Sequence, residues 1–194
     1  MIPSGLKPGH VLLYRGVDAL GDAIDFFEPH GQFCHAALVY DATRLVRQNP
    51  GGPAFENLAD APWINIMVKR LDLTKFRGSD YDPHSDPAWL AIFPARVLAH
   101  MKDVYDYAGI AAAAQEGILE DVGLGGLVAF LKHFPDPVSA LSQHMEYCSA
   151  FDRIILEETT KIALNLSDFS LDSREAALQE TPQDLSTEPL LINL

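Results

Sequence analysis

The distribution of apolar residues in the first half of the chain predicts strands separated by turns. Strands carry short apolar or alternating runs, and Pro, Gly, Asn and Asp mark the turns between them. Runs that fit this description predict strands at 10–16, 33–41, 44–48, 63–71 and 88–93. Between them, composition predicts a helix at 20–29 and loops at 49–62 and 77–86.

The apolar residues take on the period of a helix after residue 93. Pro94 suits a first helical turn, and we predict a helix over 94–107. Residues 109–146 are apolar, rich in alanine and interrupted by glycines, which predicts one or two helices. Another helix is predicted to start at Cys148. The acidic C-terminal part has a turn signal in "ETPQDL" and an apolar end, "PLLINL", which predicts a last strand or an ordered tail.

This order of elements, strands first and helices later, predicts the α+β class, with an antiparallel sheet and helices packed on it. The length of 194 residues and the lack of a linker predict a single domain over 1–194. Residues 109–146 would then be a helical insertion. Such an insertion either adds a second helical layer to the core or forms a lid over a cleft.

Composition and charge narrow the classes of partner. The chain has 14 basic and 27 acidic residues, a net charge of −13, which argues against nucleic acid as a partner. No apolar run reaches the roughly 18 residues of a transmembrane helix. The start "MIPSGLKPGH" lacks the pattern of a signal peptide, so we expect a cytoplasmic or virion-associated protein.

Cys148 and His35 are the residues whose type and position suggest chemistry. The N-terminus of a helix favours the thiolate form of a cysteine, and Cys148 is predicted to stand at such a place. A nucleophile also needs a base, and His35 is a polar ring inside the apolar run "FCHAALVYD". The structural alternative for His35 is a buried histidine that hydrogen-bonds to the backbone.

Five short segments, in their order along the chain, resemble the circularly permuted branch of the NlpC-type papain-like superfamily of cysteine peptidases and amidases. They are "KPGHVLLYRG", "CHAALVYD", "VYDYAG", "EYCSAF" and "ETPQDLSTEPLLINL". The resemblance implies a permuted papain-like half-barrel packed against the helix that carries the nucleophile. It further implies that Cys148 attacks a carbonyl carbon and that His35 is the base, with no cofactor.

The resemblance also implies a third polar residue, which orients the imidazole. In the family this residue is often a glutamate on the strand after the histidine strand. The matching run here is "RLVRQNP", in which Gln48 falls closest, with Asn49 and Glu56 as neighbouring alternatives. A glutamine can orient the ring but brings no charge to stabilise an imidazolium. The glutamate that often follows Cys-Ser in the family is replaced by Ala150.

Two functions are therefore compatible with the sequence. The first is a thiol-dependent hydrolase of amide bonds, a peptidase or amidase acting on peptidoglycan stem peptides. The second is a catalytically weak or inactive papain-like fold that serves as a structural or binding component of a larger assembly, such as a phage particle.

Metal and disulfide sites are not expected. His30, Cys34 and His35 lie close together, but no second cluster with the spacing of a zinc site accompanies them. Cys34 and His35 alternate along a strand, so that Cys34 would face away from a cleft containing His35 and Cys148. We therefore predict no Cys34–Cys148 disulfide.

Overall fold

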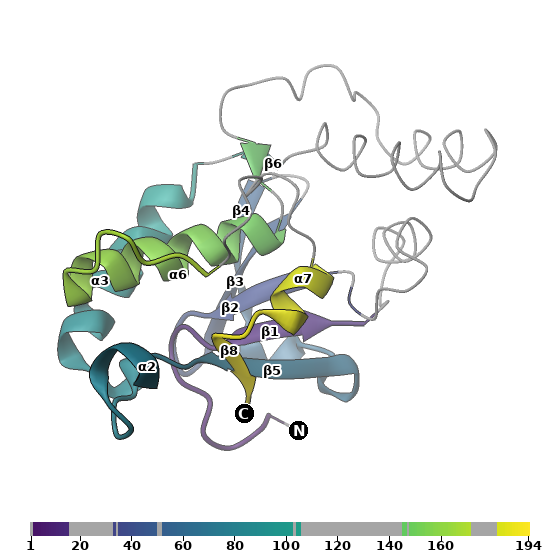
Figure 1. The fold of residues 1–194 in the computed structure, drawn as a ribbon. Coiled ribbons are helices and arrows are strands. Elements are labelled where there is room, and N and C mark those ends of the chain that lie inside the picture. Colours follow the sequence, from purple (N-terminus) through teal and green to yellow (C-terminus); the bar gives the residue numbers. More distant parts are fainter. Residues whose placement is uncertain are drawn as a thin grey trace, which may run out of the picture.

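The protein has a mixed α+β fold in which helices pack on an antiparallel sheet (Figure 1). The computed structural model describes residues 2–15, 33, 35–49, 52–102, 104–105, 145–146, 148–171 and 182–194. In this part of the chain the strands of the sheet come from the N-terminal half and from the last residues. The longest helices come from between them.

The main sheet has six strands in the order β4-β3-β2-β1-β5-β8, and each neighbouring pair is antiparallel. Its strands are β1 Val11–Tyr14, β2 His35–Val39, β3 Arg44–Asn49, β4 Gly52–Asn57, β5 Ile66–Leu71 and β8 Leu191–Asn193. A separate parallel pair consists of β6 Val104–Tyr105 and β7 Met145–Glu146. β1 and β2 are therefore central strands, whereas β4 and β8 are the edges.

Two long helices cover one face of this sheet. They are α3 Pro87–His100 and α6 Cys148–Leu164; α3 packs against α6, and α6 packs against β2 and β3. The shorter helices are α2 Thr74–Arg77, α7 Pro182–Thr187 and the 3₁₀ turns Leu58–Asp60, Trp63–Asn65 and Pro83–Ser85.

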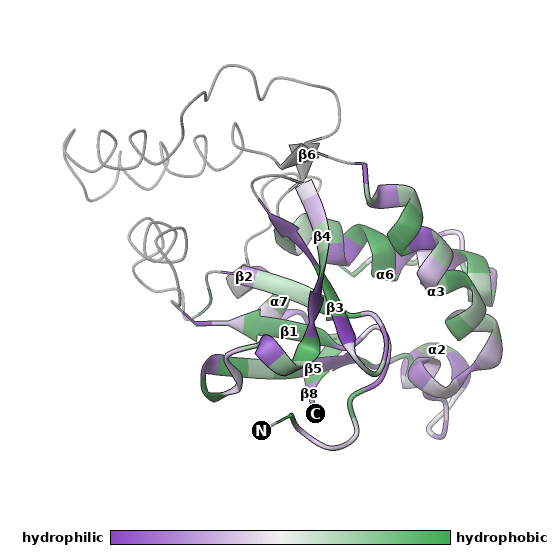
Figure 2. Cartoon of the chain, turned by 180° about the vertical axis from the view of Figure 1, so that it is seen from behind, coloured by the Kyte–Doolittle hydropathy of each residue, from purple (hydrophilic) through white to green (hydrophobic). Residues whose placement is uncertain are grey.

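Side-chain alternation along the strands creates an apolar cluster on each face. Ala36 and Leu38 belong to the cluster that also contains Cys148 and residues of α3 and α6. Ala37 and Val39 belong to a smaller cluster on the opposite face. Figure 2 shows β1 and β2 in apolar colours along most of their length, as expected for strands buried on both faces.

The C-terminal strand is attached to the sheet by side-chain as well as backbone contacts. β8 pairs with β5 in the register Leu71↔Leu191. Lys69 is only 7% exposed, and its ammonium donates to the carbonyl oxygen of Ser186 and, at 3.1 Å, to that of Leu191. Ser186 lies in the last turn of α7, so one lysine joins the sheet, α7 and β8.

Several strand and helix predictions are confirmed. β1, β2, β3 and β5 lie within or closely match the predicted runs, α6 starts at Cys148, and the apolar C-terminal end contains β8. The predicted helix at 20–29 and the helices predicted over 109–146 lie outside the described residues. The exception is Met145–Glu146, which forms β7 rather than helix.

The predicted strand at 88–93 is wrong, because these residues lie inside α3. The Asp86 side chain accepts a hydrogen bond from the Ala88 N–H at 2.8 Å, and Pro87 follows it as the first helical residue. Pro94 is consequently inside the helix rather than in its first turn. The helix predicted over 94–107 ends at His100, before β6.

The predicted loop at 49–62 is also wrong, because residues 52–57 form β4. This strand pairs with β3 from Arg44↔Asn57 to Asn49↔Gly52. Pro53 obscured the strand, since proline cannot donate a hydrogen bond to a neighbouring strand. It is tolerated because β4 is an edge strand. The turn predicted in "ETPQDL" is instead largely part of α7.

Candidate functional site

The candidate residues gather at one end of the sheet, where α6 begins. β1 ends at Tyr14, β2 begins at His35, and these two residues are register partners. β6 lies against β4 and pairs with β7, which directly precedes α6. The N-terminus of α6 is thereby placed near the end of the sheet at which β2 begins (Figure 1).

Cys148 is the first residue of α6, a helix of 17 residues. Its side chain is 1% exposed and belongs to the apolar cluster between α6 and the sheet. Cys148 has a thiol rather than a disulfide bond, while Cys34 lies outside the described residues. The N–H groups of a first helical turn favour a negative charge placed among them, so the position suits a thiolate nucleophile.

His35 is the first residue of β2 and is 4% exposed. Its ring centroid lies 6.2 Å from that of Tyr14, with a tilt of 50° between the ring planes. Strand alternation places His35 on the face of Ala37 and Val39, away from the face that α6 covers. The His35 imidazole can therefore approach the Cys148 thiol only past the end of the sheet, because the strands separate the two faces.

The predicted third residue, Gln48, is completely buried but lies on the other face. It alternates with Val46, which belongs to the cluster that packs on α6. The two alternatives, Asn49 and Glu56, lie instead on the face of His35, because Glu56 pairs with Leu45 of the smaller cluster. Strand geometry thus brings Gln48 towards the Cys148 side and its alternatives towards the His35 side.

Glu56 is held by two donors from β3. Arg47 Nε lies 2.7 Å from Glu56 Oε1, and Asn49 Nδ2 lies 3.1 Å from the same oxygen. The positive charge of Arg47 offsets the negative charge of Glu56. This carboxylate is therefore bound within its own hairpin and contributes little net charge to an imidazole nearby.

The sequence pattern does not single out two further polar residues at this end, Tyr14 and Asp152. Tyr14 is 1% exposed and Asp152 is 0% exposed. Burial raises the pKa of the Tyr14 phenol above its usual range; the Arg47 cation lowers it, and the Glu56 and Asp152 carboxylates raise it further. Tyr14 therefore stays protonated at neutral pH. The sequence does hold a signal that could have identified Asp152: it is an aspartate four residues after Cys148, on the apolar side of the predicted helix.

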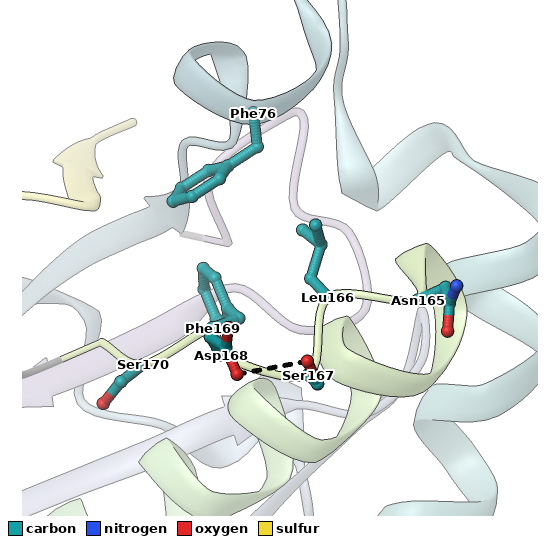
Figure 3. A pocket seen from close by; sticks show the side chains of 7 residues that line it. All are labelled: Phe76, Asn165, Leu166, Ser167, Asp168, Phe169 and Ser170. Carbon is teal, nitrogen blue, oxygen red and sulfur yellow. Dashed lines mark hydrogen bonds between the residues drawn. The ribbon is translucent and has the colours of Figure 1, made fainter.

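A separate hollow lies at the other end of α6. It has a volume of about 370 Å³ and is lined by Phe76 and by residues of the segment 165–170. Figure 3 shows the rings of Phe76 and Phe169 turned towards each other, and their centroids are 5.6 Å apart. Cys148 and His35 are not among its lining residues, so this hollow does not belong to the candidate site.

Among the described residues, no three His, Cys, Asp or Glu side chains are grouped so as to hold a metal ion. Over those residues, no helix combines the length and the apolar character needed to cross a membrane. His30 and Cys34 lie outside the described part.

Comparison of the chain with protein-family models gives no match, and comparison with curated proteins gives none. Function is therefore inferred from the residues and their arrangement.

Proposed function

We propose that the protein is a thiol-dependent hydrolase of amide bonds, with Cys148 as nucleophile and His35 as base. One observation carries the proposal: the helix that starts with Cys148 packs against the strand that starts with His35. A thiol hydrolase needs a cysteine at a helix N-terminus and a histidine that serves as its base, and the proposal gives these roles to Cys148 and His35. The proposed fold is papain-like and permuted, and the resemblance of the five sequence segments supports it.

In the proposed reaction, the Cys148 proton passes to His35 and the thiolate attacks the amide carbonyl carbon. The Cys148 backbone N–H stabilises the oxyanion that forms. The C–N bond then breaks, the imidazolium protonates the leaving amine, and a thioester remains on Cys148. Water, deprotonated by the neutral imidazole, hydrolyses the thioester, which releases a carboxylic acid and restores the thiol. Gln48 is proposed to line the Cys148 side of this site.

The proposed substrates are peptides, with cell-wall stem peptides as the first class to test. Peptide substrates follow from the resemblance and from the net charge of −13, which disfavours anionic lipid surfaces and nucleic acid. One feature favours the alternative of a structural or binding component: Cys148 and His35 are 1% and 4% exposed, which restricts the approach of a substrate.

Alkylation by iodoacetamide at pH 6 distinguishes the two functions. We expect Cys148 to react about tenfold faster in the wild type than in the His35→Gln variant, because an ordinary thiol with a pKa near 8.5 is almost fully protonated at this pH. Peptide mass spectrometry measures the rate separately for Cys148 and for Cys34, the internal reference. If native Cys148 reacts no faster than in H35Q, the structural alternative replaces the hydrolase. If the thiol proves to be activated, the substrate class is tested next: the wild type should cleave stem peptides, and Cys148→Ala should not.

A further inference from the structure

The hollow at the C-terminal end of α6 has the size and the walls of a site for a small ligand. Its volume of about 370 Å³ is within the range of ligand pockets, and one of its walls is aromatic. The rings of Phe76 and Phe169 stand edge to face in this wall, with Leu166 beside them (Figure 3). Phe169 is 3% exposed but Phe76 is 46% exposed, so part of the aromatic wall is open to a ligand.

The backbone around the hollow is held by the turns that end α6. Asn165 adopts the left-handed conformation, with φ +53°, and the Leu166 N–H donates to the Lys161 carbonyl oxygen at 3.1 Å. This bond belongs to a common motif at helix C-termini. The Phe169 N–H then donates to the Leu166 carbonyl oxygen at 3.1 Å. The hollow is therefore pre-formed, and binding does not have to order this segment first.

The charges around the hollow favour a cation. Asp168 is an exposed residue of its lining, and Ser167 Oγ donates to Asp168 Oδ1 at 3.1 Å. Asp168 forms no ion pair with any residue in the described part of the chain. Arg77, the neighbour of Phe76 in the sequence, donates to the Leu164 carbonyl oxygen at the end of α6. The Asp168 carboxylate thus remains available to a positively charged ligand.

We propose that this hollow binds an organic cation, with an ammonium group at Asp168 and an apolar body against Phe76 and Leu166. A carboxylate and an aromatic ring both attract an ammonium ion. An organic anion is disfavoured, because the described residues that line the hollow include a carboxylate and neither Lys nor Arg, and because the chain has a net charge of −13. The hollow lies at the opposite end of α6 from Cys148, so this proposal does not depend on the proposed function.

NMR titration of the backbone amides with three probes of similar size tests the proposal. Phenethylammonium carries a positive charge, phenethyl alcohol is neutral, and phenylacetate is negative. We expect phenethylammonium to shift the amide signals of residues 165–170, with a dissociation constant in the millimolar range. It should bind about fivefold more tightly than the alcohol, since an exposed ion pair and a cation–π contact each contribute a few-fold. Phenylacetate should bind most weakly.

Two variants separate the charge from the apolar wall. Asp168→Asn is expected to make phenethylammonium and phenethyl alcohol bind with similar affinity. Phe76→Ala is expected to weaken the binding of both probes about fivefold, because it removes the exposed ring. Asp80→Asn is the matched control. Asp80 is also exposed and accepts from the preceding serine, at 3.3 Å, but it does not line the hollow, so this variant should keep the preference of the wild type.

Three results overturn the proposal. If no probe shifts the amide signals of residues 165–170, the hollow is not a binding site. If the wild type binds phenethylammonium no more tightly than phenethyl alcohol, the hollow does not select a cation. If Asp168→Asn keeps the preference for phenethylammonium, the carboxylate is not the group that selects it. None of these results affects the role of Cys148, which alkylation tests separately.

Discussion

Acidification from pH 7 to pH 5 is expected to lower the free energy of unfolding by about 4 kcal/mol, because two buried histidines bind protons only after unfolding. His10 and His84 are each 2% exposed, and their ring centroids are 4.5 Å apart. His84 Nδ1 donates to the Pro8 carbonyl at 2.9 Å, and its Nε2 accepts from the Leu71 N–H at 3.1 Å. His10 Nδ1 accepts from the Lys7 N–H at 3.3 Å. Each ring thus has one nitrogen that accepts a hydrogen bond, and protonation of that nitrogen would break the bond.

The sign of this stability change and the pH range in which it occurs follow from the same contacts. Burial, the largest cause, lowers the pKa of His10 from 6.5 to about 3 and that of His84 from 6.5 to about 4. The stability that the two neutral histidines contribute is fully present above their unfolded pKa of 6.5. It is lost as the pH falls, because between 6.5 and about 4 these histidines are protonated only in the unfolded chain. At pH 5 each histidine contributes about 2 kcal/mol of this loss. Asp82 acts only at lower pH, since its pKa falls from 3.8 to about 2 on folding.

Urea unfolding at pH 7 and pH 5 measures this loss. His10→Gln removes one of the two groups and is expected to halve the difference between the two pH values. His100→Gln is the matched control, because it also removes a histidine, but His100 Nε2 faces the Glu158 carboxylate at 3.1 Å rather than a backbone N–H donor. Equal stability of the wild type at both pH values would contradict the neutral histidine pair.

Replacement of Gly9 by alanine is expected to destabilise the protein by about 3 kcal/mol, through backbone strain and overpacking together. Gly9 has φ +83°, and a Cβ atom there would lie 2.3 Å from Cη2 of Trp89. Trp89 cannot yield easily: it is 0% exposed, stacks on Phe93 at 5.1 Å, and donates from Nε1 to Thr160 Oγ1 at 3.2 Å. Any shift of the indole would therefore disturb the contact between α3 and α6.

Gly5 provides a control with a similar positive φ and open surroundings. Its φ is +89°, and a Cβ atom would meet nothing within 4 Å. Gly5→Ala is expected to cost only about 1 kcal/mol, the strain of the left-handed region. Thermal unfolding of both variants separates strain from overpacking. A loss for Gly9→Ala no larger than that for Gly5→Ala would show that Trp89 adapts without cost.

The class of the fold could be predicted from the sequence because the central strands are strongly apolar. β1 and β2 are buried on both faces, so their runs are uninterrupted. The errors arose where local signals compete. Residues 88–93 look like a strand, yet the cap formed by Asp86 and Pro87 starts a helix. Pro53 argues against a strand, yet an edge position accepts it.

The arrangement of the site depends on which face of the sheet each strand residue occupies. The spacing of residues in the sequence does not show which of the two faces a helix will cover. Gln48 is the predicted third residue because it falls closest to the position that the resemblance implies, but its alternation with Val46 places it on the α6 side. Cys148 lies more than 100 residues after His35 in the sequence, and only the packing of α6 on β2 shows that their two elements are neighbours. Contacts between distant segments cannot be deduced from one sequence.

The attachment of β8 to β5 has a consequence for synthesis on the ribosome. β5 ends at Leu71, but its partner strand begins at Leu191, so 119 residues (72–190) are translated between them. During that time β5 is an open sheet edge, and Lys69 lacks the carbonyl oxygens to which it donates in the folded protein. The nascent chain therefore exposes an aggregation-prone edge until β8 emerges from the ribosome. Expression in cells short of nascent-chain chaperones should lower the soluble yield.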